Sequence, residues 1–399
     1  MDYLSTNLEF LEKQPIMNIG CLGSVSHGKS TMVKLLTGKS TQQHSKEKIR
    51  NITMKVGYAN AKIYQKDDLE LNTDNGKLVH HFSFVDCPGH HELIEVMMSG
   101  ANLMDGGIVV VAGNQTIDQQ PQLKQHLLTA KMVGIKKLIF ILNKLDLITK
   151  NVALERHYEL INYLEEFDIK DPIIIPMALN LGLNKKYLLE TILKHFPPIK
   201  RNDSKEETLF SISRSFDINK PGIDPIKLKG GVVGGSVING NLNIGDEVTI
   251  SPGQIKYDSK NKKWLNKPFK AKVLSLKSEN DNLENICCGG LTAIGLDIDP
   301  FFTQNDKLKG QILHFNDTVT CKGKINCNII TLDNFKFSKN QVYSLQIGCA
   351  NVQGKISDIS KNNITFELNK MISIYNDIKV LVSKKTDKMI ELVGVGSIN

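Results

Sequence analysis

Residues 23–30 combine glycines, hydroxyl groups and one lysine in the order GSVSHGKS, directly after an apolar run and directly before a helical pattern. The spacing matches G-x-x-x-x-G-K-S in the strand, loop and helix setting that this motif requires. Glycines let a backbone wrap closely around a chain of phosphates, and a helix N-terminus adds free N–H groups and a favourable dipole. We expect Lys29 to reach the β- and γ-phosphates of a nucleotide and the Ser30 hydroxyl to bind Mg²⁺. The residues predicted to bind the nucleotide here are Ser26, His27, Gly28, Lys29, Ser30 and Thr31.

A second motif, DCPGH at residues 86–90, follows the apolar run His81–Val85. The Asp86 carboxylate at the end of that run is suited to hold the magnesium shell through a water molecule, and the Gly89 N–H to sense a γ-phosphate. His90 is then placed to position an attacking water. A histidine alone would as often be a packed or surface residue without a role as a functional one, but the presence of Asp86 and Gly89 favours the functional interpretation of His90.

The third motif is NKLD at residues 143–146, again at the end of an apolar run. The carboxyl end of a parallel strand is where α/β sheets bind ligands. The Asp146 carboxylate fits the two ring N–H donors of guanine and is repelled by adenine, which offers an acceptor at N1. Asn143 can bond N7 and brace its loop, and the Lys144 stem can lie over the base. The three motifs together predict a site for GTP or GDP with Mg²⁺.

The elements around these motifs alternate in type, as a mostly parallel α/β sheet requires. The apolar runs are Ile16–Leu22, His81–Val85, Gly107–Ala112, Lys137–Leu142 and Pro172–Pro176, and the helical patterns are Lys29–Leu36, Leu123–Val133 and Asn151–Glu166. After Pro198 short strands separated by Gly and Asn turns take over, which is typical of β-barrels. The predicted fold is an α/β P-loop GTPase domain over residues 1–200, followed by one β-barrel domain over 201–313 and another over 314–399.

Composition narrows the class of protein further. The 399 residues carry a net charge of +8 that no single segment concentrates, so nucleic acid is a permitted partner. Seven scattered cysteines suit a reducing compartment better than a disulfide framework. No apolar stretch approaches the ~20 residues of a bilayer crossing, and the N-terminus lacks the positive start of a signal peptide. We therefore expect a cytoplasmic protein that does not enter a membrane.

With these motifs, the chain resembles the translation GTPases, and among them the gamma subunit of eukaryotic and archaeal initiation factor 2. The resemblance is carried by the stretch RNITMKVGYANAKIY at residues 50–64, by RSFDINKPG at 214–222 and by LKGGVVGGS at 228–236. It is close over residues 16–313 and weaker over the last 86.

The resemblance implies roles that spacing alone does not give. Thr53 corresponds to the switch threonine that closes on Mg²⁺, and His90 to the histidine that orients water; the catalytic residues implied are Lys29, Thr53, Gly89 and His90. Ala178 and Leu179 fall in the base-binding segment. Asn51 and Tyr58 correspond to residues that help to form the tRNA site.

The implied partners are methionyl initiator tRNA, the small ribosomal subunit, nucleotide-exchange and GTPase-activating factors, and alpha and beta subunits. In the family, alpha contacts the first barrel and beta the G domain.

The sequence also departs from this family. Residues 65–77 contain no cysteine where relatives often carry a small zinc element, so no zinc is predicted. Met177 replaces the serine of the base-binding segment, His91 replaces an aspartate, and residues 394–399 carry no basic side chain where the family typically has a basic tail.

Two alternatives stay open at this point. One is an elongation-type carrier of aminoacyl-tRNA with the same fold. The other is a nucleotide-locked scaffold for partner subunits, against which the joint presence of Lys29, Ser30, Thr53, Asp86 and His90 argues.

Overall fold

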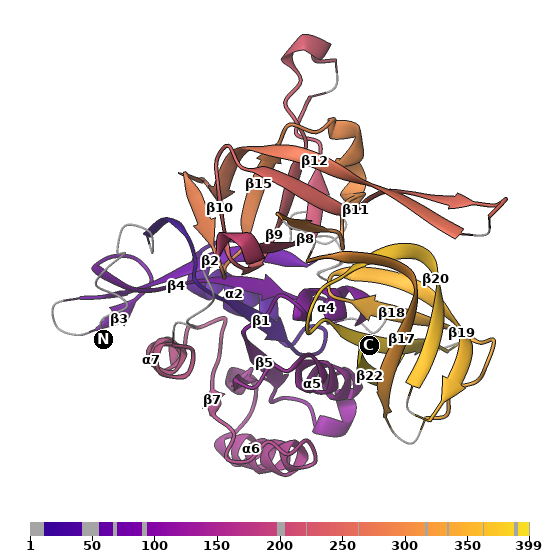
Figure 1. The fold of residues 1–399 in the computed structure, drawn as a ribbon. Coiled ribbons are helices and arrows are strands. Elements are labelled where there is room, and N and C mark those ends of the chain that lie inside the picture. The colour runs from indigo at the N-terminus through magenta and orange to yellow at the C-terminus, as the bar shows by residue number, and fades with distance from the viewer. Residues whose placement is uncertain are drawn as a thin grey trace. The chain divides into compact units, whose positions relative to one another are not determined.

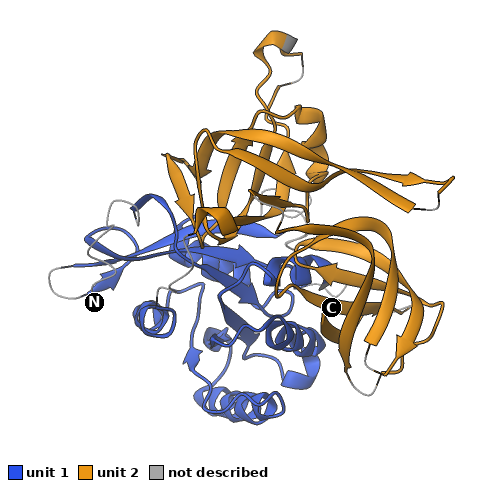
Figure 2. Cartoon of the chain, in the orientation of Figure 1, with its two compact units in different colours: residues 1–199 blue, residues 200–399 orange. Residues whose placement is uncertain are grey.

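The chain forms two compact units, residues 1–199 and 200–399, which Figure 2 colours separately. The computed structural model describes residues 12–41, 56–66, 70–89, 94–197, 204–220, 222–261, 263–315, 318–332, 335–361, 363–386 and 390–398.

A seven-stranded sheet in the order β3-β2-β4-β1-β5-β6-β7 organises the first unit (Figure 1). Its strands are β1 (Asn18–Leu22), β2 (Gly57–Gln65), β3 (Leu71–Asn72), β4 (Lys77–Asp86), β5 (Gly106–Ala112), β6 (Leu138–Asn143) and β7 (Ile174–Pro176). The five strands from β4 to β7 in that order run parallel, whereas β2 and β3 pair antiparallel at the edge. The carboxyl ends of β1, β4 and β6 therefore meet at one edge of the sheet.

The helices of this unit are α2 (Lys29–Thr37), α4 (Ile94–Ala101), α5 (Pro121–Val133), α6 (Lys150–Glu165) and α7 (Lys185–His195). One buried cluster joins side chains of α2 and α7 to Ile19, Phe84 and Ile108 on the sheet. The alternate strand residues, such as Val109 and Val111, are buried as well. Because both faces of the sheet are covered, its central strands are continuously apolar, which is why the sequence located them.

The first barrel of the second unit consists of β8 (Leu209–Phe216), β9 (Val232–Asn239), β11 (Glu247–Asp258), β12 (Lys263–Ser278), β15 (Thr292–Leu296) and β16 (Ile312–His314). Pairing of β11 with both β12 and β16 closes the ring. The short strands β10 (Asn241–Asn243), β13 (Asp281–Leu283) and β14 (Asn285–Cys287) lie beside it.

The second barrel is closed by β17 (Thr320–Thr331), β18 (Val342–Ile347), β19 (Ala350–Ser360), β20 (Asn363–Ile374), β21 (Lys379–Lys385) and β22 (Ile390–Ile398). Each barrel has its own apolar core. Hydrogen bonds also join the barrels: Trp264 Nε1 donates to the carbonyl oxygen of Leu368 at 3.2 Å, and Ser373 Oγ to that of Ser251 at 2.6 Å.

An α/β domain followed by two β-barrels, as the sequence predicts, is confirmed. The sequence assigned no strand to β2 and no helix to α7, both of which the structure contains. The exact domain borders at 200/201 and 313/314 stay predictions.

Candidate nucleotide site

The loops that follow β1, β4 and β6 contain the three sequence motifs, and hydrogen bonds join them to one another. Residues 23–28 turn from β1 into α2 with Ser26 at φ 60° and Gly28 at φ 108°. A Cβ on Gly28 would lie 2.4 Å from Nδ2 of Asn143, so only glycine allows the loop after β6 to come this close. The first and third motifs therefore share one small volume, as a ligand with both phosphates and a base requires.

The ammonium group of Lys29 is buried inside the first loop. Its Nζ donates to the carbonyl oxygens of Gly23 at 2.8 Å and Ser24 at 2.7 Å, and the residue is 6% exposed. Burial lowers the pKa of Lys29, and the nearby Asp86 carboxylate opposes that shift. A cation held in a water-poor loop beside backbone N–H groups is an effective partner for phosphate oxygens.

Asp86 at the end of β4 is completely buried and is approached by two hydroxyl groups. Ser30 Oγ donates to its Oδ2 at 2.8 Å, and Thr41 Oγ1 to the same oxygen at 2.5 Å. Hydroxyl and carboxylate oxygens are the hard ligands that Mg²⁺ prefers, and this ion commonly takes one or two protein oxygens together with substrate phosphates and water. Ser30 and Asp86 thus fit the role predicted for them.

The base side of the site is braced by Asn143. Its Nδ2 donates to the carbonyl oxygen of His27 at 2.7 Å, and its Oδ1 accepts from the N–H of Leu179 at 3.0 Å. One buried amide thereby ties the phosphate loop to the segment that contains Ala178 and Leu179. Asp146 is exposed and accepts a bond from Asn180 Nδ2 at 3.2 Å. Lys144 adopts the left-handed conformation, φ 65°, at the turn between them.

The remaining predicted site residues that the structure describes are Gly89, Thr31 and Tyr58. Gly89 is buried against the first loop, since a Cβ there would lie 2.5 Å from Lys29 Nζ and 2.8 Å from the carbonyl oxygen of Gly23. Thr31 lies exposed in the first turn of α2. Tyr58 is half-buried on β2, where it pairs with Val85 next to Asp86. Asn51, Thr53 and His90 lie outside the described residues.

Two residues at the site were missed by the sequence analysis. Thr41, 45 positions from Asp86, has no motif around it. His126 on α5 accepts a hydrogen bond at Nδ1 from the N–H of Gly23 at 3.2 Å. Its only sequence signal is a histidine among the apolar positions of a helix.

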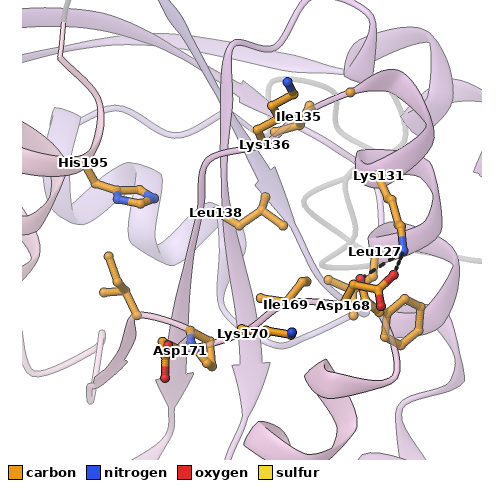
Figure 3. A pocket seen from close by; sticks show the side chains of 14 residues that line it. Leu127, Lys131, Ile135, Lys136, Leu138, Asp168, Ile169, Lys170, Asp171 and His195 are labelled. Carbon is orange, nitrogen blue, oxygen red and sulfur yellow. Dashed lines mark hydrogen bonds and ion pairs between the residues drawn. The ribbon is translucent and has the colours of Figure 1, made fainter.

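A cavity of about 430 Å³ lies elsewhere in this unit (Figure 3). Its lining includes Leu138 at the amino end of β6 and Ile173 just before β7, together with Lys131, whose Nζ lies 2.6 Å from Asp168 Oδ2. The three motifs occupy the opposite, carboxyl ends of the strands. The cavity is therefore separate from the candidate nucleotide site.

Comparisons with known proteins agree with this fold. Residues 14–198 match the family model of the elongation factor Tu GTP binding domain. The fold resembles the crystal structure of a bacterial selenocysteine-specific elongation factor, with a TM-score of 0.76 and 22% identity; the match covers 96% of this chain and 58% of that one. It also resembles the elongation factor SelB of Methanococcus maripaludis in complex with a GTP analogue, with a TM-score of 0.74 and 19% identity, over 97% of this chain and 79% of that one. The class that fold and matched domain define is the translational GTPase.

Full-length relatives narrow the class to one family. The chain is 34% identical to the eukaryotic translation initiation factor 2 subunit gamma of Encephalitozoon cuniculi, over 98% of this chain and 94% of that protein. It is 33% identical to the translation initiation factor 2 subunit gamma of Sulfurisphaera tokodaii, over 96% and 98% of the two chains. Residues 319–398 match the family model described as initiation factor eIF2 gamma, C terminal. The chain belongs to the gamma-subunit family of translation initiation factor 2, and is a GTP-binding protein of translation initiation.

Among the described residues, no helix has the length and apolar character needed to cross a membrane. Nor do the described ranges contain a group of three or more His, Cys, Asp or Glu side chains arranged to hold a metal ion. The prediction of no zinc stays a prediction.

The brace formed by Asn143 can be tested by replacement. Asn143→Ala removes both hydrogen bonds of the side-chain amide and leaves the N–H of Leu179 buried without its acceptor. Each buried group left without a partner costs about 1–3 kcal/mol. We expect GDP affinity, measured by calorimetry, to fall about a hundredfold, equal to about 2.7 kcal/mol. The control Asn102→Ala, which removes a side-chain hydrogen bond to the Met98 carbonyl, should leave GDP affinity within about twofold of that of the unaltered protein. Unchanged affinity in Asn143→Ala would contradict the bracing role.

Three buried histidines of this unit predict a pH dependence of stability. Burial lowers the pKa of His27 and of His80 to about 4, and that of His126 to about 3. Because these values lie below the unfolded pKa of about 6.5, the unfolded chain binds more protons as the pH falls below 6.5. The stability is therefore complete above pH 6.5 and is lost as the pH approaches 4, by up to about 3 kcal/mol per histidine.

Urea unfolding of the full chain between pH 7.5 and 4.5 measures this loss. His80 lies outside the motifs and 5.3 Å from the Phe82 ring, so His80→Phe is a matched variant that removes one titrating group. Its free energy of unfolding should fall less steeply with acid than that of the unaltered protein. Identical slopes would show that His80 does not contribute.

Proposed function

We propose that this chain is the nucleotide-switched subunit that holds methionyl initiator tRNA in its GTP state, delivers it to the small ribosomal subunit and releases it after hydrolysis. The observation that carries the proposal is the 34% identity, over 98% of the chain, to a protein named as the gamma subunit of initiation factor 2. The hydrogen bonds that Lys29 makes with Gly23, Asp86 with Ser30, and Asn143 with Leu179 support it, because they place side chains suited to the phosphates, the magnesium ion and the base of a guanine nucleotide.

In the proposed reaction, water attacks the γ-phosphorus, the bond to the β–γ bridging oxygen breaks, and GDP and phosphate leave. Lys29 and the loop N–H groups hold the phosphates, Gly89 contacts the γ-phosphate, and His90 orients the water. Ser30, Thr53 and, through water, Asp86 would hold Mg²⁺, which would supply charge neutralisation at the phosphates. Loss of the γ-phosphate removes the contacts that order the segments around Thr53 and Gly89.

The register of the sheet supports a coupling between this step and tRNA. Gly57 on β2 pairs with Asp86 on β4, and Tyr58 pairs with Val85. The proposed tRNA residue Tyr58 therefore lies beside the end of β4, where the second motif begins. Asn51 is the other proposed tRNA residue. A hundredfold preference for one state requires about 2.7 kcal/mol of coupling, which two short loops can supply.

Hydrolysis is proposed to be slow in the isolated protein. The chain has four arginines, and the two in the described residues are already paired. Arg156 contacts Glu159 on α6, and Arg214 binds Asp306 in the second unit at 2.9 Å. Both described arginines are thus held by carboxylates. A GTPase-activating partner is proposed to accelerate the reaction, and an exchange factor to restore GTP.

Alpha and beta subunits complete the proposed assembly, with alpha on the first barrel and beta on the G domain, in the cytoplasm. A contact on the G domain is supported by apolar side chains around α6: Leu147, Leu154 and Tyr158 are 62%, 47% and 63% exposed. Leu154 and Tyr158 lie one helical turn apart on α6, and Leu147 lies in the turn before it. Exposed apolar side chains that form a patch are typical of interaction sites.

An elongation-type carrier remains the second candidate, because the fold resembles selenocysteine-specific elongation factors. Filter binding with a non-hydrolysable GTP analogue separates the two. We expect methionyl initiator tRNA to bind at least tenfold more tightly than elongator methionyl-tRNA, and about a hundredfold more weakly with GDP, in line with typical couplings. Equal affinity for the two tRNAs would favour the elongation-type carrier, and equal affinity with both nucleotides would contradict the switch.

Replacing His90 distinguishes the switch from a scaffold in which hydrolysis has no role. His90→Ala should lower the single-turnover hydrolysis rate about a hundredfold or more, because a positioned group in the transition state contributes about 10²–10⁴. GDP affinity should stay within about twofold. His157→Ala on α6 is the matched control and should hydrolyse GTP at the unaltered rate. An unchanged partner-stimulated rate in His90→Ala would favour the scaffold.

A further inference from the structure

A hydrogen bond joins the first glycine of the phosphate loop to an outer helix that carries no motif. The N–H of Gly23 donates to His126 Nδ1 on α5 at 3.2 Å, across 103 positions of sequence. His126 is 1% exposed, so water has no access to replace this acceptor. Gly23 itself has φ 126°, and a Cβ there would lie 2.2 Å from the carbonyl oxygen of Val110. The position of Gly23 is thus fixed in two ways: His126 accepts its N–H, and the backbone of Val110 lies too close for any residue but glycine.

Gly23 also binds the buried ammonium group of Lys29. Its carbonyl oxygen accepts from Lys29 Nζ at 2.8 Å, and the carbonyl oxygen of Ser24 at 2.7 Å does the same. Gly89 packs against Gly23 as well. A shift of Gly23 would therefore move the two groups that face the phosphates.

The imidazole of His126 is suited to accept this hydrogen bond at all times. Acceptance at Nδ1 requires a neutral imidazole with its proton on Nε2. Burial, followed by the charge of Lys29 and then His27, lowers the pKa of His126 to about 3. His126 therefore keeps its acceptor at every pH at which translation occurs.

We propose that His126 is a positioning residue for nucleotide binding: it holds the N–H of Gly23 and so sets where Lys29 and the loop N–H groups meet the phosphates. It acts through Gly23 and does not touch the nucleotide. The inference rests on the proposed nucleotide site.

Two substitutions of similar size separate the hydrogen bond from packing. In His126→Asn the Oδ1 atom stands at the place of Nδ1, whereas His126→Leu fills the space without an acceptor. GDP affinity, measured by calorimetry on the full chain, should fall about tenfold in His126→Leu and less than threefold in His126→Asn. The ³¹P resonance of the bound β-phosphate should shift in His126→Leu alone.

Leu127→Ala is the matched control, because Leu127 is equally buried on α5 and has no bond to the loop. It should lower the melting temperature while leaving GDP affinity and the ³¹P resonance unchanged. Equal affinities in His126→Leu and His126→Asn would overturn the proposal, as would loss of affinity in Leu127→Ala to the same extent.

A measurement on the unaltered protein covers the case in which a variant does not fold. Hydrogen exchange of the Gly23 amide should be among the slowest of the loop, since the bond is buried, and fast exchange would overturn the proposal. Absence of GDP binding by the unaltered protein is a different result: it would overturn the proposed function itself, whatever the exchange rate of Gly23.

Discussion

The structure of the first unit depends on keeping one ammonium group, that of Lys29, inside the protein. Removing a charge from water is costly unless polar atoms surround it. Here two backbone carbonyls accept from it directly, and the Asp86 carboxylate lies close enough to oppose the effect of burial on its pKa. Each of these partners sits at the carboxyl end of a parallel strand or in the loop after it. The sheet order is thus the arrangement that brings a cation, a carboxylate and a row of N–H groups to one edge.

The sequence predicted the parts of this arrangement that are contiguous in the chain. The phosphate loop, the motif at Asp86 and the motif at Asn143 each combine a strand end with chemically distinct residues, so each could be located without knowing the fold. The contacts between motifs could not, because Thr41 reaches Asp86, and His126 reaches Gly23, across 45 and 103 positions. Such approaches are set by tertiary packing, which leaves no local pattern.

Strand β2 was missed for a different physical reason. Its buried positions Ala59, Ala61 and Ile63 alternate as a half-buried strand requires, but two of them are alanines, whose small side chains give a weak apolar signal. The helix α7 was missed although its buried residues follow the helical period, because Asn184 at its start and the lysines after it are common in this lysine-rich and asparagine-rich chain. Composition hid the boundary signals there.

The hydrogen bond between the two barrels involves a residue whose fluorescence can be measured. Trp264 is the one tryptophan of the 399 residues, and its indole donates to a carbonyl of the neighbouring barrel while its ring lies 5.0 Å from that of Tyr257. Tryptophan emission of the native protein, excited where tyrosine does not absorb, is therefore a local spectroscopic probe of the second unit. Any change in that emission when a guanine nucleotide is added must have been transmitted out of the unit where the nucleotide is proposed to bind.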